Sequence, residues 1–98
     1  MPRLTRQELI DRLCQRLQGT PDPTGQVDVR TSGGVIIVAP SADDIPAAVA
    51  RLKPLLGYRF LAIHRDDLFV ASRATIQTKI GILDETGATL KAPDVKLR

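Results

Sequence analysis

The stretch Val35-Ile36-Ile37-Val38-Ala39 is decisive for the fold, because it runs apolar without alternation and ends at Pro40. An uninterrupted apolar run of this length is typical of a strand that is buried on both faces of its sheet. The segment 58–64 also carries apolar side chains on both of its faces. Two such strands require cover on each side of the sheet, so we expect the second helix on one face and the first helix, or a second copy of the chain, on the other.

Patterns on either side of this stretch predict a hairpin before it and a helix after it. Val27, Val29 and Thr31 alternate with polar residues, and the segment 32–34 is a glycine-bearing turn. After Pro40 a helical apolar stripe is predicted, and a proline at position 54 is expected to shorten its last turn. The stripe consists of Ile45, Ala48, Val49, Leu52 and Leu56, and Gly57 ends the helix.

The later strands are predicted from alternation and turn chemistry. We expect the strand over 58–64 to turn at Arg65-Asp66 and to return over 68–72. A long alternating strand over 76–82 is expected to form a hairpin with 88–91. The strands after the second helix are therefore predicted to be antiparallel, as a β-meander, and the order of elements permits a β-grasp-like arrangement.

The first helix is predicted by its capping signals. Thr5 followed three residues later by Glu8 is a capping box. Within the predicted N-terminal helical segment 1–19, the helix is therefore expected to begin near Arg6. Its apolar stripe consists of Leu9, Ile10, Leu13, Cys14 and Leu17. A proline-rich linker over 20–25 follows, long enough to let this helix pack on a distant surface of its own sheet or on another chain.

Length and composition allow one domain. The chain has 98 residues, 43% of them hydrophobic and 26% charged, which matches ordinary soluble globular proteins. We predict a single small α+β domain over 1–98, with the hairpin, second helix and meander in 26–91 and a charged tail in 92–98. The apolar runs are far shorter than the roughly 20 residues of a membrane helix, and the first residues do not resemble a signal peptide. We therefore expect a cytoplasmic protein that makes no membrane contact.

Few residues carry chemistry. With one cysteine, Cys14, and one histidine, His64, the chain cannot assemble a Cys/His zinc site alone, and we expect no metal and no cofactor. The local motifs of hydrolases, metalloproteases and nucleotide-binding loops are absent from the sequence. The one concentration of reactive groups is His64-Arg65-Asp66-Asp67, which could act as a general base or as a weak metal or phosphate site. A solvated turn at the rim of the sheet explains the same residues without a site.

The charge balance is mildly basic. The chain has 14 Lys and Arg against 11 Asp and Glu, a formal charge of +3. Arg6, Arg12 and Arg16 could line the exposed face of the first helix and, with Lys79, follow a phosphate backbone. The three aromatic residues lie in predicted apolar strands, so no exposed stacking platform accompanies this charge.

These patterns favour a non-catalytic interaction module, in which Leu9, Leu13 and Leu17 contact a partner. A homodimer is favoured, because small domains commonly complete their burial by self-association. Docking on a larger protein partner, whose identity is unknown, is also expected. A small nucleic-acid-binding protein that uses the basic face of the first helix is the alternative, and an enzyme with a site around His64 ranks last.

Overall fold

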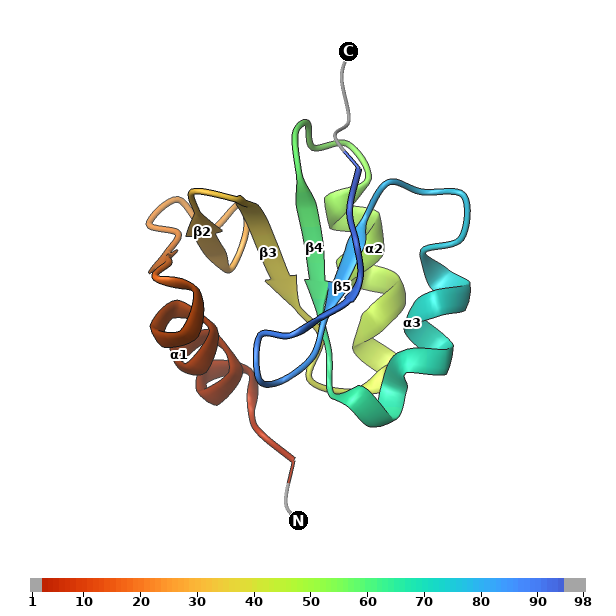
Figure 1. Ribbon diagram of the computed structural model, residues 1–98, viewed down its shortest axis with the longest axis horizontal. Helices are drawn as coiled ribbons and strands as arrows, with labels where there is room; N and C mark the ends of the chain where they lie inside the picture. The colour runs from red at the N-terminus through yellow and green to blue at the C-terminus, as the bar shows by residue number, and fades with distance from the viewer. Residues whose placement is uncertain (1–2, 95–98) are drawn as a thin grey trace.

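A six-stranded mixed sheet lies between helices in the computed structural model, which describes residues 3–94 (Figure 1). The strands are β1 (Thr20–Pro21), β2 (Val29–Thr31), β3 (Gly34–Val38), β4 (Arg59–Ala62), β5 (Gly81–Leu83) and β6 (Thr89–Lys91), and they follow chain order across the sheet. One face carries α1 (Arg6–Leu17), and the other carries α2 (Ile45–Leu52) and α3 (Leu68–Ala74). The prediction of a single α+β domain with a helix first is confirmed. The first two residues of the predicted first helix, and residues 95–98 of the predicted tail 92–98, lie outside the described residues.

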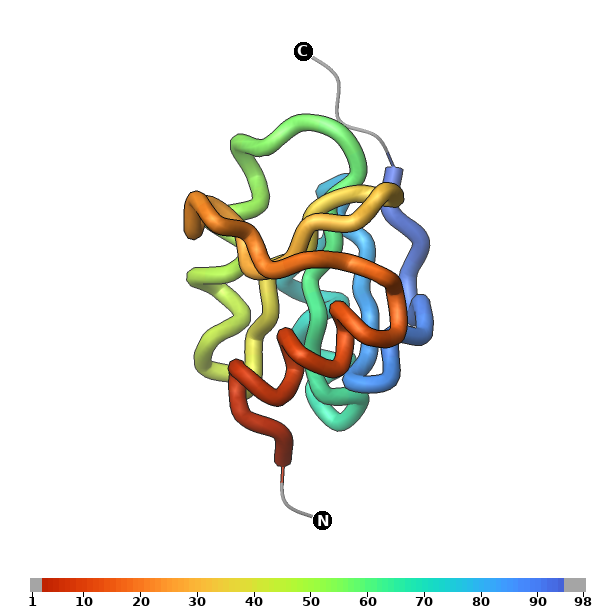
Figure 2. The backbone as a smooth tube through the Cα atoms, turned by 90° about the vertical axis from the view of Figure 1, so that its left-hand side faces the viewer, coloured from red at the N-terminus to blue at the C-terminus, as the bar shows by residue number. Residues whose placement is uncertain are grey.

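Helix α1 begins at the predicted capping box and covers one face of its own sheet. The hydroxyl of Thr5 accepts from the amide of Glu8 at 3.2 Å, and the Glu8 carboxylate accepts from the amide of Thr5 at 2.9 Å. Leu9 and Leu13 are fully buried, and Figure 2 shows α1 lying across the strands nearest to the viewer. They pack in one cluster with Val29, Ile36, Val38, Ala62 and Leu83. The second face of the sheet is therefore covered within the chain.

The segment 20–25, predicted as a free linker, begins as a strand. β1 pairs antiparallel with β2, so the chain enters the sheet directly after α1. The Asp22 carboxylate then holds the loop by accepting from the amides of Val27 at 3.0 Å and Thr24 at 3.1 Å, and from Nε of Arg30 at 3.1 Å. The hydrogen bond from the Val27 amide, with those from Thr24 and Arg30, holds the pKa of Asp22 well below its ordinary value. This anchored loop keeps α1 on the adjacent sheet.

The prediction that the strands after the second helix pair antiparallel is wrong in part. β2 and β3 form the expected antiparallel hairpin, with Val29 opposite Ile36, and β5 and β6 form the expected second hairpin. Between them, however, β3 pairs parallel with β4 and β4 pairs parallel with β5. The reason is that α2 and α3 each return the chain across the same face, which makes successive strands point the same way. Because the strands follow chain order across the sheet and α3 lies between β4 and β5, the β-grasp-like order is not the one that forms.

The return strand predicted over 68–72 is the helix α3. Leu68, Ala71 and Ala74 recur every three residues and pack against the core on the α2 side of the sheet, while the residues between them are outside. This is a helical period, and a strand would have buried every second residue instead. The 3-10 helix η2 (Arg65–Asp67) begins this helical path shortly after β4, in place of the predicted tight turn.

The strand predicted over 76–82 is reduced to Gly81–Leu83. Threonine hydroxyls close backbone turns before it: Oγ1 of Thr75 donates to the carbonyl of Ala71 at 2.9 Å, and Oγ1 of Thr78 donates to the carbonyl of Thr75 at 2.6 Å. Threonine offers the backbone this local alternative to strand pairing. The shortened strand still leads into the predicted turn over 84–87.

Helix α2 is shorter than its predicted stripe. It follows the 3-10 helix η1 (Ala42–Asp44) and ends at Leu52, because Pro54 lies two residues further on and cannot continue a helix. The buried Arg59 at the start of β4 donates to the carbonyls of Leu52 at 3.1 Å and Lys53 at 3.3 Å. Burial lowers the pKa of Arg59, whose positive charge is well placed at the negative end of the helix.

Candidate functional site

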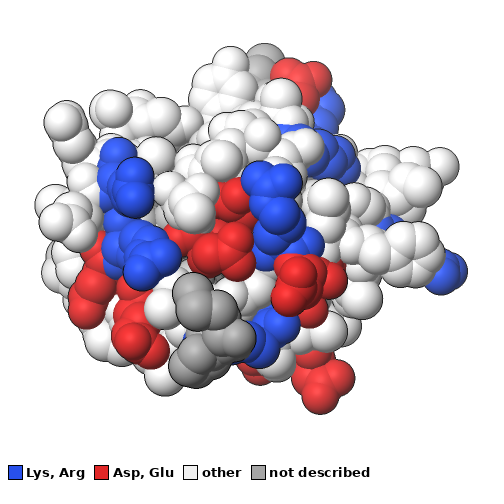
Figure 3. Space-filling model, turned by 60° about the horizontal axis from the view of Figure 1, so that its bottom comes forward, with Lys and Arg blue, Asp and Glu red and all other residues white. Residues whose placement is uncertain are grey.

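The carboxyl ends of the three parallel strands bring distant parts of the chain to one end of the molecule. Pro40, His64 and Asp84 follow β3, β4 and β5 within two residues. In open α/β sheets ligands bind outside the carboxyl ends of parallel strands, so this end is a candidate site. Acidic and basic side chains alternate over it (Figure 3).

His64 is only 6% exposed, and both of its ring nitrogens have partners. Nδ1 lies 3.1 Å from Oε2 of Glu85, and Nε2 lies 3.2 Å from the carbonyl oxygen of Leu4. Both partners are acceptors, to which a ring N–H can donate. Both ring nitrogens are thus engaged within the chain. His64 is therefore a buried residue that links the end of β4 to the β5–β6 turn and to the segment before α1. It does not lie at the solvated rim of the sheet, where the sequence placed it.

Asp84 fixes the β5–β6 turn from inside. Its Oδ1 accepts from the amide of Thr86 at 2.8 Å and from the amide of Ala88 at 3.0 Å, and its Oδ2 accepts from Arg65 at 2.8 Å. Burial alone would raise the pKa of Asp84, but hydrogen bonds from Thr86 and Arg65 outweigh it and lower the pKa to about 2. The acceptor positions of this carboxylate are therefore used within the chain. Within residues 3–94, no three His, Cys, Asp or Glu side chains are grouped so that they could hold a metal ion.

The basic residues predicted to contact nucleic acid do not form one surface. Arg6, Arg12 and Arg16 are exposed along α1. Lys79 lies on the loop between α3 and β5, and α3 covers the opposite face of the sheet. The alternating charges in Figure 3 also interrupt any basic track at the strand ends. Nucleic-acid binding stays a prediction.

The leucines predicted to contact a partner face the sheet of their own chain. Leu9 and Leu13 are fully buried, and Leu17 packs half-buried against the same cluster. Their stripe therefore needs no second chain to cover it. The homodimer remains a prediction, and its surface has to be sought elsewhere.

An exposed apolar surface lies on α3 and the turn that follows it. Phe69 is 73% exposed, Ile76 is 70% exposed, and Val70 lies beside Phe69 with 39% exposed. The guanidinium carbon of Arg73 lies 5.8 Å from the centre of the Phe69 ring. We call these four residues the α3 face. This surface was not predicted, because a strand was expected here. The three-residue spacing of Leu68, Ala71 and Ala74 is the signal that indicates which side chains point outward.

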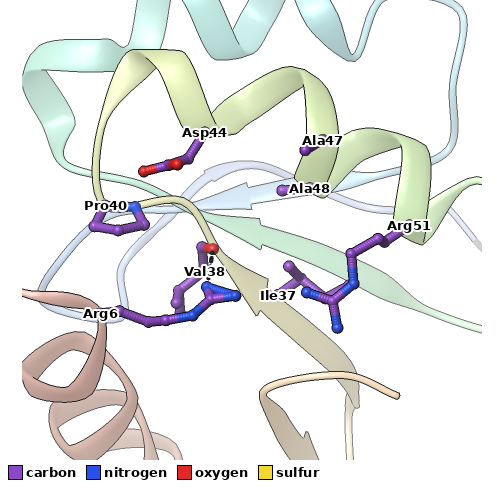
Figure 4. A pocket seen from close by; sticks show the side chains of 8 residues that line it. All are labelled: Arg6, Ile37, Val38, Pro40, Asp44, Ala47, Ala48 and Arg51. Atoms are coloured by element: carbon purple, nitrogen blue, oxygen red, sulfur yellow. Dashed lines mark hydrogen bonds between the residues drawn. The ribbon is translucent and has the colours of Figure 1, made fainter. Parts of the chain in front are cut away.

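A second concave site lies between α1, β3 and α2. It brings Arg6 of α1 and Arg51 of α2 to opposite sides of one pocket, above Ile37 of β3 (Figure 4). Arg51 was not predicted as a site residue, because 45 positions separate it from Arg6 and no local motif connects the two.

Comparison of the chain with protein-family models, with curated proteins and with solved structures gave no match. Over the described part of the chain, the helices are too short and too polar to span a bilayer.

Proposed function

We propose that this chain is a non-catalytic interaction module that self-associates through the α3 face. The observation that carries the proposal is the exposure of Phe69 and Ile76, at 73% and 70%. Phe69 lies on α3, and Ile76 lies in the turn that directly follows it. Burying an apolar side chain of this size contributes about 1.5–3 kcal/mol, which a partner surface would recover. Single exposed apolar residues are common, whereas several large ones on one short segment favour a docking surface.

A second copy of the chain supplies a matching apolar surface. A twofold pairing would set the two copies of the α3 face against each other, so that Phe69 and Ile76 of each copy are buried by the other.

A larger protein partner would use the same face, in competition with the second copy. The cytoplasmic location expected from the sequence belongs to the same proposal.

The test compares association of the unmodified protein with that of Phe69→Asp, Ile76→Asp and Leu56→Asp by sedimentation velocity. Leu56 is 52% exposed and lies outside α3, so Leu56→Asp introduces the same charge at a comparable exposed leucine. We expect a dimer for the unmodified protein and for the Leu56 variant, and an association constant at least about tenfold weaker for the two α3 variants. A monomeric unmodified protein, or an equal loss in all three variants, would overturn the proposal.

A further inference from the structure

The pocket between Arg6 and Arg51 lies at the carboxyl end of β3, the first of the parallel strands, and has a volume of about 160 Å³. Its floor is apolar, formed by Ile37, Val38, Pro40, Ala47 and Ala48. Two guanidinium groups, one from α1 and one from α2, line the pocket from opposite sides, with Ile37 between them (Figure 4). A small hollow with an apolar floor and convergent charged donors has the composition of a ligand site.

Each guanidinium is held in place by backbone carbonyls. Nη1 of Arg6 donates to the carbonyl of Val38 at 3.1 Å. Nη2 of Arg51 donates to the carbonyls of Gln26 at 3.0 Å and Gly25 at 3.3 Å. A guanidinium has five N–H donors in a rigid fork, so each group keeps donors beyond those that anchor it. Anchoring on one edge lowers the conformational cost of presenting the other donors to a ligand.

Two carboxylates lie close to these arginines, and both have partners. Asp28 lies 3.4 Å from Arg6 and accepts from the amide of Val38 at 2.8 Å, so it is tied to the end of β3. Asp44 lines the pocket and accepts from the hydroxyl of Ser41 at 2.8 Å. Because these charges partly offset the two arginines, an anion in this pocket has to engage both guanidiniums at once to be held.

We propose that this pocket binds the phosphate group of a small phosphorylated ligand between Arg6 and Arg51. Guanidinium forks match phosphate oxygens in bidentate pairs, and charge-assisted hydrogen bonds of this kind are stronger than neutral ones. A phosphate dianion can use two guanidiniums, whereas a carboxylate has one negative charge and two oxygens to share between them. The site is independent of the α3 face, so either proposal can fail without the other.

The experiment is an NMR titration of the full chain with inorganic phosphate, at ionic strength held constant with sodium chloride. We expect saturable shifts of the backbone amides around Val38 and Ala47 at low-millimolar phosphate. Arg51→Gln and Arg6→Gln should each weaken the affinity about tenfold or more. Arg12→Gln, which removes an exposed charge from the same helix as Arg6, should leave the affinity within about twofold.

Melting curves in chloride alone, recorded for each variant, separate lost binding from lost folding. If Arg6→Gln is poorly folded, Arg51→Gln alone tests the site, because the Arg51 side chain donates only to the loop at Gly25 and Gln26. The proposed phosphate site would be refuted by chemical-shift changes that sodium chloride alone also produces. It would also be refuted by phosphate binding of unchanged affinity in a folded Arg51→Gln variant. Equal saturable binding of acetate would overturn the assignment to phosphate.

Discussion

Replacing Leu13 by Ala tests whether α1 belongs to the core of its own chain. Leu13 is fully buried in the cluster that joins α1 to β2 and β3. Leu→Ala changes at such positions lower the free energy of unfolding by about 2–5 kcal/mol, through lost transfer free energy and the cavity left behind. One helix and one sheet face enclose this site, and a single helix can shift only partly into the gap, so we expect a loss of about 3 kcal/mol. For a domain of this size the melting temperature should fall by about 12–24 °C.

Urea unfolding followed by circular dichroism measures this loss, with Arg12→Ala as the matched control. Arg12 is the exposed neighbour of Leu13 on α1, and its replacement should change the free energy of unfolding by no more than about 0.5 kcal/mol. The loss in Leu13→Ala should not depend on protein concentration over about a hundredfold range, because the contact is made within one chain. A loss below about 1 kcal/mol, or one that depends on concentration, would show that α1 is not packed as described.

Three further changes probe the ties at the sheet ends and the close approach of β3 to β4. His64→Gln should lower the free energy of unfolding by about 1–2 kcal/mol, because partly buried acceptors lose the ring that contacts them, and an unchanged urea midpoint would show that these contacts do not stabilise the fold. The pKa of Asp84 is lowered from 3.8 to about 2, so its stabilising contribution is complete above the higher value and is lost as the pH falls toward the lower one. The stabilities of the unmodified protein and Asp84→Asn, measured by urea titration, should therefore converge on acidification, and a difference that stays constant would contradict the assignment. Gly34→Ala should cost about 2 kcal/mol or more, as φ is left-handed. Its new Cβ would also lie 2.5 Å from the backbone carbonyl oxygen of the residue before β4. Gly33→Ala, whose Cβ would have its nearest neighbour at 3.7 Å, is the control, and an equal loss there would refute the explanation.

Local signals predicted the elements that depend on neighbouring residues. The capping box at Thr5 and Glu8 and the hairpin around the turn at 32–34 were expected and are present. The segment 68–72 was assigned wrongly because its aromatic and β-branched residues favour strands, and strand preference depends on the surface that a segment meets. Here the segment meets α2 and the sheet through residues spaced every three positions, which stabilises a helix.

Topology, and not local sequence, brings the candidate sites together. The predicted concentration of reactive groups at His64 is real, but its partners Glu85 and Leu4 are 21 and 60 positions away. In the predicted meander the strand over 68–72 would have lain between β4 and β5, whereas the structure has these two strands adjacent. The pocket between Arg6 and Arg51 likewise depends on α1 and α2 reaching β3 from opposite sides of the sheet.

The most direct test of self-association through α3 is an isotope-filtered NMR experiment on a mixture of labelled and unlabelled chains. Such an experiment reports only contacts between different copies, so a contact between Phe69 and Ile76 within one chain gives no cross-peak. We expect cross-peaks between the ring protons of Phe69 in one copy and the methyl protons of Ile76 in the partner subunit. Intermolecular cross-peaks from other surfaces, or none at concentrations where light scattering gives the monomer mass of 10.7 kDa, would contradict the proposal.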